Sequence, residues 1–171
     1  MRNFSAKPLV LSGVFIALTI LFTYVFSIQT PFLRISFGFL PIAVYAVMFG
    51  PLRTACMAAV ADLLGSMLFF AGLFFPGFTL SAFISGFIYG YFFHRKQLTI
   101  KQIYIPFILI FLFVDLGLNT LWLTMLYHKA ASLFLLSRLA KAALFLPMQI
   151  FLFSMVYKPL SVFLPKPHIL K

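Results

Sequence analysis

The stretch FVDLGLNTLWLTMLYHK, residues 113–129, decides how the rest of the chain is interpreted. It is strongly apolar, yet it carries Asp115, Asn119 and Trp122 at i, i+4 and i+7. On a helix this spacing places all three on one face. The next apolar run adds two cations, Arg138 and Lys141, at i and i+3. Because polar side chains inside a membrane are costly and need a reason, we expect these residues to line a ligand pocket.

The composition indicates an integral membrane protein. The 171 residues are 64% hydrophobic and 9% charged, and the mean hydropathy is +1.12. A soluble domain has about 25% charged residues. The length suits a single helical membrane domain over residues 1–171 and leaves no room for a soluble catalytic domain. With one cysteine in the chain, neither a disulfide framework nor a cysteine zinc motif can form.

Hydrophobic runs predict an all-α fold with six transmembrane helices. The first run is too long for the core of a signal peptide and is read as a retained helix. The predicted helices are residues 9–28, 37–49, 52–70, 79–93, 103–127 and 130–157.

The basic residues predict the orientation in the membrane. Six spans place both termini on one side, and nine basic residues fall on that side against two, Arg34 and Lys129, on the other. The nine are Arg2, Lys7, Arg53, Arg95, Lys96, Lys101, Lys158, Lys166 and Lys171. An excess of this kind marks the cytoplasmic side, so both termini are expected there. Because the charges alternate with apolar runs, the net charge of +11 does not indicate nucleic acid.

Depth along the predicted helices collects the polar residues in the outer half of the membrane. Asp62 lies near mid-span, where a charge costs about 2.5–3.5 kcal/mol on an insertion scale. The expected pocket has aromatic, carboxylate, amide and cationic groups, which suit a flat heteroaromatic solute with carboxylates. Its candidate residues are Asp62, Asn119, Trp122, Arg138, Lys141, Phe69 and Arg34.

Five of these residues also have a structural explanation. Trp122 suits an interfacial belt, and Arg138 and Lys141 suit snorkelling to the headgroups. Asn119 suits a hydrogen bond between helices, and Asp62 suits a structural ion pair.

Gly13 and Ala17 form a small-xxx-small pair in the first run. Such pairs permit close helix packing, either inside the bundle or against a partner subunit.

The sequence gives little support for an enzymatic function. It contains no H-E-x-x-H motif, no carboxylate cluster, no C-x-x-C and no Walker lysine loop, so no cofactor or ATPase activity is expected. Asp62 and Asp115 could still form a proton relay, which leaves a proton-coupled secondary transporter as one alternative.

Four stretches resemble the folate-specific substrate-binding (S) component of energy-coupling-factor (ECF) vitamin transporters. They are FGFLPIAVYAVMFGPLRTACMAAVADLLGSMLF (37–69), FFPGFTLSAFISGFIYGYFF (74–93), LGLNTLWLTMLYHK (116–129) and RLAKAALFLPMQ (138–149). The resemblance covers nearly the whole chain, from about Leu9 to Tyr157.

This resemblance implies a six-helix subunit of the bacterial cell membrane that captures folate from outside. It implies a transmembrane scaffold and two ATP-binding-cassette ATPases as partners, with delivery by toppling of the S component in the membrane. In such a protein Gly13 and Ala17 would pack on the scaffold, and the loops at 29–37 and 71–78 would gate the pocket.

The resemblance also implies residue roles. Asp62 and Asn119 would face the pterin edge and Trp122 would stack near it, while Arg138 and Lys141 would hold the aminobenzoyl-glutamate portion. An S component for riboflavin, pantothenate or thiamine remains the other alternative.

Overall fold

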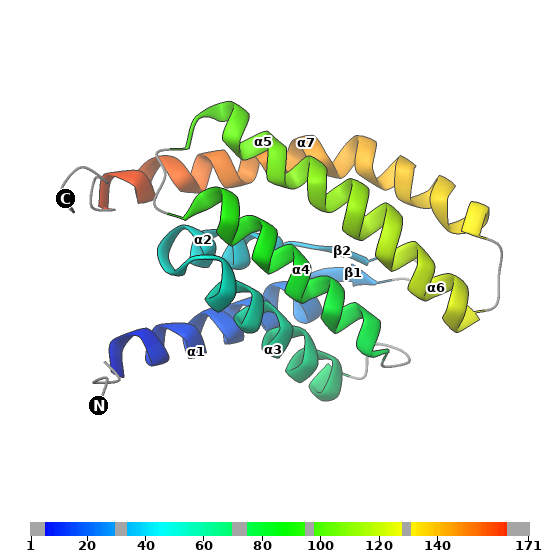
Figure 1. The fold of residues 1–171 in the computed structure, drawn as a ribbon, viewed down its shortest axis with the longest axis horizontal. Coiled ribbons are helices and arrows are strands. Elements are labelled where there is room, and N and C mark those ends of the chain that lie inside the picture. The colour runs from blue at the N-terminus through cyan, green and yellow to red at the C-terminus, as the bar shows by residue number, and fades with distance from the viewer. Residues whose placement is uncertain (1–5, 30–33, 70–74, 95–97, 128–130, 164–171) are drawn as a thin grey trace.

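The structure is a computed structural model that describes residues 6–29, 34–69, 75–94, 98–127 and 131–163. Six helical rods run through these residues (Figure 1). In chain order the helical elements are α1 (Ala6–Ile20), η1 (Leu21–Val25), α2 (Phe39–Phe49), α3 (Pro51–Phe69), α4 (Pro76–Phe93), α5 (Ile100–Leu109), η2 (Ile110–Leu118), α6 (Asn119–Tyr127) and α7 (Ala131–Phe163). The elements α1 and η1 form one rod, and α5, η2 and α6 form another, so the predicted all-α class with six helices is confirmed.

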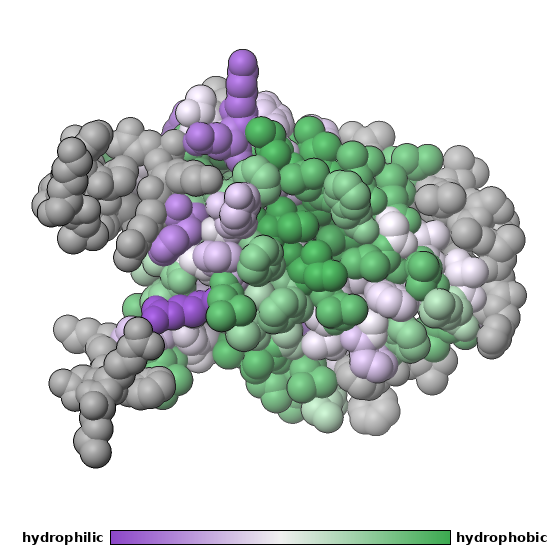
Figure 2. Space-filling model, in the orientation of Figure 1, coloured by the Kyte–Doolittle hydropathy of each residue, from purple (hydrophilic) through white to green (hydrophobic). Residues whose placement is uncertain are grey.

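Within the described residues, four helices are long and apolar enough to cross a membrane: Pro8–Val25, Pro51–Phe69, Lys101–Tyr127 and Phe145–Val162. The helix α2 is a shorter apolar segment. Figure 2 shows hydrophobic side chains over the middle of the visible face, and hydrophilic ones toward the end where α1 begins. Helix α7 ends at that same end of the bundle (Figure 1). The chain is therefore a multi-pass membrane protein.

The first helix ends earlier than predicted. It was expected to reach Ile28, but helical structure stops at Val25 and the chain enters a hairpin of β1 (Ser27–Gln29) and β2 (Arg34–Ser36). The strands are antiparallel, with Ser27 opposite Ser36 and Ile28 opposite Ile35. Strand pairing satisfies backbone groups that would otherwise be unpaired where the helix stops.

The fourth helix begins earlier than predicted. It starts at Pro76 instead of residue 79, because a proline fits the first turn of a helix, where its missing N–H is not needed. Residues 70–74 of the predicted gating loop lie outside the described residues, as do residues 30–33 of the other one.

Helices α3 and α4 pack closely through small residues. A Cβ on Gly86 would lie 2.7 Å from the Thr54 carbonyl oxygen and 3.0 Å from Ala55 Cα. A Cβ on Gly90 would collide with Pro51. The helix backbones can approach this closely only because both positions lack a side chain.

An aromatic core fills the half of the bundle near the α2–α3 turn. Phe93 and Phe153 are fully buried and stack with their ring centres 4.7 Å apart. Phe107 and Tyr89 join this core, and their two rings meet edge to face, 5.2 Å apart between centres. This core packs α2, α4, α5 and α7 against one another at that end of the bundle.

Candidate ligand-binding site

Asp62 on α3 is held by two donors from different elements. The Tyr24 hydroxyl of η1 donates to Asp62 Oδ1 at 3.2 Å and lies 3.0 Å from the Asp62 main-chain oxygen. The Thr79 hydroxyl of α4 donates to Asp62 Oδ2 at 3.0 Å. These hydrogen bonds offset part of the cost of placing a polar side chain in a membrane.

The Tyr24 ring connects Asp62 with Phe69, one of the predicted site residues. Tyr24 is buried, and its ring lies against Gly65, where any side chain would collide with it. The ring also stacks on Phe69 with centres 5.9 Å apart and an interplanar angle of 19°. Phe69 itself is 47% exposed, so one of its faces remains available for contact.

Trp122 on α6 is fixed against the first turns of α4. Its indole N–H donates to the Ser81 hydroxyl at 3.1 Å. The indole also covers Gly77, where a Cβ would lie 2.6 Å from Trp122 Cδ2, and its ring centre lies 5.6 Å from that of Phe75. Only a glycine at position 77 leaves room for the indole in this place.

Asn119, one turn before Trp122, has one polar atom satisfied and one not. Its Nδ2 donates to Asp115 Oδ1 at 3.2 Å. Its Oδ1 is buried and has no hydrogen-bond partner among the described residues. A buried acceptor without a partner is rare and calls for an explanation such as a ligand donor.

Helix α4 brings the carboxylate and the indole to the same level of the bundle. Asp62 bonds to Thr79 and Trp122 bonds to Ser81, two residues further along the same helix. Four residues of the predicted site are thus connected through contacts of η1, α3, α4 and α6 or by one helical turn: Asp62, Phe69, Asn119 and Trp122.

The three predicted cations are placed only in part. The backbone of Arg34 lies in β2, opposite Gln29, and the backbones of Arg138 and Lys141 lie in α7. The side chains of all three lie outside the described residues.

Sequence reasoning missed Tyr24, Thr79, Ser81 and Phe75. Gly65 and Gly77 were the available signal, because a glycine inside an apolar helix often marks the close approach of another group. Nothing in the sequence says which aromatic ring covers each glycine.

Gly13 and Ala17 lie on an exposed face of α1. A Cβ added to Gly13 would have nothing within 4 Å, and the neighbouring Val14 is 49% exposed. In the described part of the chain this pair therefore does not pack inside its own bundle.

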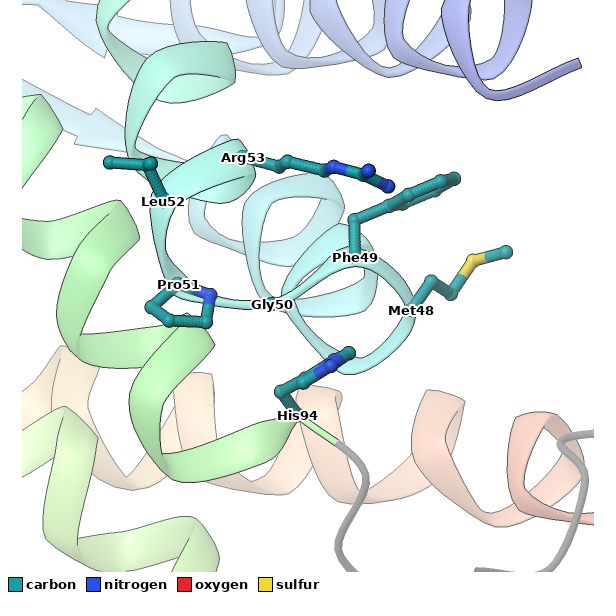
Figure 3. A pocket seen from close by; sticks show the side chains of 7 residues that line it. All are labelled: Met48, Phe49, Gly50, Pro51, Leu52, Arg53 and His94. Carbon is teal, nitrogen blue, oxygen red and sulfur yellow. The ribbon is translucent and has the colours of Figure 1, made fainter. Parts of the chain in front are cut away.

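A separate hollow of about 420 Å³ lies at the opposite end of α4 from Thr79 and Ser81. Arg53, Met48 and His94 extend to one side of the Gly50 turn there (Figure 3). Gly50 has φ +85°, a conformation that favours glycine. This hollow contains no predicted site residue.

Six helical rods, with a polar and aromatic cluster between η1, α3, α4 and α6, define a helical membrane protein. No group of three or more metal-ligating side chains occurs within the described residues. The model of one family, described as "ECF-type riboflavin transporter, S component", matches residues 3–162, and the chain belongs to this family of ECF transporter S components. It is thus a subunit of a membrane transport system of the bacterial cell membrane.

The proteins similar to this chain include two named relatives and a solved structure. The folate transporter FolT of Clostridium novyi (strain NT) is 46% identical over 132 residues, which is 77% of each chain. The folate transporter FolT of Leuconostoc mesenteroides is 34% identical over 131 residues, 72% of this chain and 70% of that one. The solved structure is a crystal structure of FolT bound with folic acid; it is 35% identical, with a TM-score of 0.85, and the match covers 89% of this chain and 93% of that one.

Proposed function

We propose that the chain is the folate-binding S component of an ECF importer. The observation that carries this proposal is the 46% identity, over 77% of each chain, to a protein named as a folate transporter. The fold match to FolT bound with folic acid supports it. The family description names riboflavin, so riboflavin is the second candidate ligand.

The chemistry of the site suits folate. Folate has a flat pterin with a donor and acceptor edge, and a tail that ends in carboxylates. Trp122 and Phe69 would contact the ring faces. Asp62 and the unpartnered Asn119 Oδ1 would accept hydrogen bonds from the pterin edge. Arg34, Arg138 and Lys141 would meet the anionic tail.

Transport would depend on partner proteins. We infer that the chain has no enzymatic activity of its own and acts with a transmembrane scaffold and two ATPase subunits. The exposed pair Gly13 and Ala17 supports a contact with the scaffold, because small residues permit close helix packing. Toppling in the membrane would then carry folate inward when the nucleotide state of the ATPases changes.

The central experiment is a binding titration of the isolated protein in detergent, without ATP. Isothermal titration calorimetry with folate is expected to give a saturable binding heat, while riboflavin, pantothenate and thiamine give none. Quenching of Trp122 provides a local second signal, because Trp122 is the only tryptophan in the chain. Binding of riboflavin without folate would overturn the assignment of the ligand.

A second titration tests the role given to Arg138. Replacing Arg138 by Ala is expected to weaken folate binding more than binding of the bare pterin, since only folate has the anionic tail. Equal losses of affinity for folate and for bare pterin would show that Arg138 does not contact the tail. Transport by a proton-coupled mechanism through Asp62 and Asp115 predicts instead that uptake persists without the ATPases and stops with an uncoupler.

A further inference from the structure

Asp62 is oriented by two hydroxyl groups that reach it from two different elements. Tyr24 comes from η1 and Thr79 from the first turn of α4, and each approaches a different carboxylate oxygen, at 3.2 Å and 3.0 Å. A carboxylate has about four acceptor positions, so both oxygens keep capacity for a ligand. The two hydroxyls therefore fix the direction of the carboxylate without using up its acceptors.

Tyr24 has little freedom to move away from Asp62. It is 8% exposed, and its ring is confined between Gly65 and Phe69. Its hydroxyl reaches both the carboxylate and the main-chain oxygen of the same residue. This double approach holds the Asp62 side chain at a set angle to its own helix.

Thr79 connects the carboxylate with the place where the indole sits. It lies between Gly77, which the Trp122 ring covers, and Ser81, which accepts the indole N–H. The bond from Thr79 to Asp62 therefore fixes α3 against the part of α4 that holds Trp122. Loss of this bond would let the indole and the carboxylate shift relative to each other.

We propose that Tyr24 and Thr79 are positioning residues of the ligand site, and that they act through the Asp62 carboxylate rather than by touching the ligand. This inference rests on the proposed function for its ligand. It adds to that function two residues which set the spacing between the hydrogen-bonding group and the stacking group of the site.

Folate titrations of near-isosteric variants test the proposal. Thr79→Val and Tyr24→Phe each remove one hydroxyl and are expected to weaken binding about fivefold, which corresponds to one hydrogen bond. Thr79→Ser keeps the hydroxyl and should bind like the unaltered protein. Two matched controls remove hydroxyl groups away from the site. In Thr54→Val the lost hydroxyl donates to the Gly50 main-chain oxygen, just before α3. In Tyr45→Phe the lost hydroxyl bonds to Ser12 of α1. If Thr79→Val and Tyr24→Phe bind folate as tightly as these controls, the proposal is wrong.

A measurement without ligand separates this proposal from the proposed function. Acrylamide quenching of Trp122 reports how well the indole is seated. Thr79→Val and Asp62→Ala are expected to raise the quenching constant by the same amount. The double variant should raise it no further, because both substitutions break the same hydrogen bond between Thr79 and Asp62. Additive increases, or none in Thr79→Val, would overturn the role of Thr79. If the unaltered protein fails to bind folate while the quenching pattern holds, the ligand assignment fails and the positioning role stands.

Discussion

At the scale of single residues, the side-chain oxygen of Asn119 is the atom that most directly calls for a ligand. It is buried and has no partner among the described residues, while the amide nitrogen of the same side chain is engaged by Asp115. Leaving such an acceptor unpaired in an apolar setting costs free energy, which a ligand N–H would recover.

We therefore predict that Asn119→Leu weakens folate binding at least about fivefold, because the donor on the ligand would be buried without a partner. Calorimetric titration measures the loss. Gln102→Leu is the control, since the Gln102 side chain accepts a hydrogen bond from Thr99 at the start of α5, away from the site. Equal folate affinities of Asn119→Leu and Gln102→Leu would show that Asn119 does not contact the ligand.

Residue-scale reasoning from the sequence selected Asp62, Asn119 and Trp122 because each is a polar or aromatic exception in an apolar run. In the structure Asp62 and Trp122 each bond to α4, and Asn119 lies one turn from Trp122 on α6. Their role in binding stays a prediction. Tyr24, Thr79 and Ser81 were missed because hydroxyl-bearing residues are common in membrane helices and usually bond to their own helix. Thr54 and Ser85 do so here.

At the scale of elements, the contact between α3 and α4 depends on glycine. A Cβ on Gly86 would meet backbone atoms of Thr54 and Ala55, which cannot rotate away as a flexible side chain could. Gly117 in η2 differs, because its nearest neighbour would be the Leu112 carbonyl oxygen at 3.6 Å, an ordinary contact distance.

Gly86→Ala is expected to lower the free energy of unfolding by about 1–3 kcal/mol through overpacking. Gly117→Ala should leave it nearly unchanged. Thermal unfolding of the two variants in the same detergent compares them directly. A midpoint for Gly86→Ala at or above that of Gly117→Ala would show that the two helices separate at little cost.

The end of the first helix shows why element boundaries were harder to predict than elements. Residues 26–28 are as hydrophobic as the helix before them, so the sequence predicted helix through Ile28. The structure instead pairs Ser27–Gln29 with Arg34–Ser36. Hydropathy does not distinguish strand from helix in a short apolar run, and the pairing partner decided the outcome.

At the scale of the whole molecule, the exposed face of α1 leads to a prediction about the transport complex. Gly13→Leu places a large side chain where the isolated protein has open space, so folding and folate affinity are expected to stay as they are. ATP-driven uptake into proteoliposomes that contain the scaffold and ATPases should fall about tenfold or more, since a close helix contact would be lost.

The control for Gly13→Leu is Met155→Leu, which changes a 65% exposed residue on α7. Uptake should be retained in this variant. Normal uptake with Gly13→Leu would show that this face of α1 is covered by lipid.

Orientation in the membrane is a second property of the whole molecule. The excess of basic residues on one side predicts that both termini are cytoplasmic. A green fluorescent protein fused to the C-terminus should fluoresce, while alkaline phosphatase fused there should be inactive. The reverse pattern would place the C-terminus outside the cell and make the proposed site face the cytoplasm, which contradicts capture of a solute from outside.

The sequence by itself determined the membrane class and the six-helix fold, and it singled out the few polar residues in the apolar runs. These properties follow from hydropathy, length and the cost of burying charge, which depend on local composition.

Only the tertiary structure decided how the stretch 113–129 takes part in a site. It placed Trp122 on Gly77 and Ser81, gave Asp62 its donors Tyr24 and Thr79, and left Asn119 Oδ1 without a partner in the described chain. The physical reason is that hydrogen bonds between helices depend on the rotation and depth of each helix. Those are set by packing over the whole bundle, which local sequence periodicity does not contain.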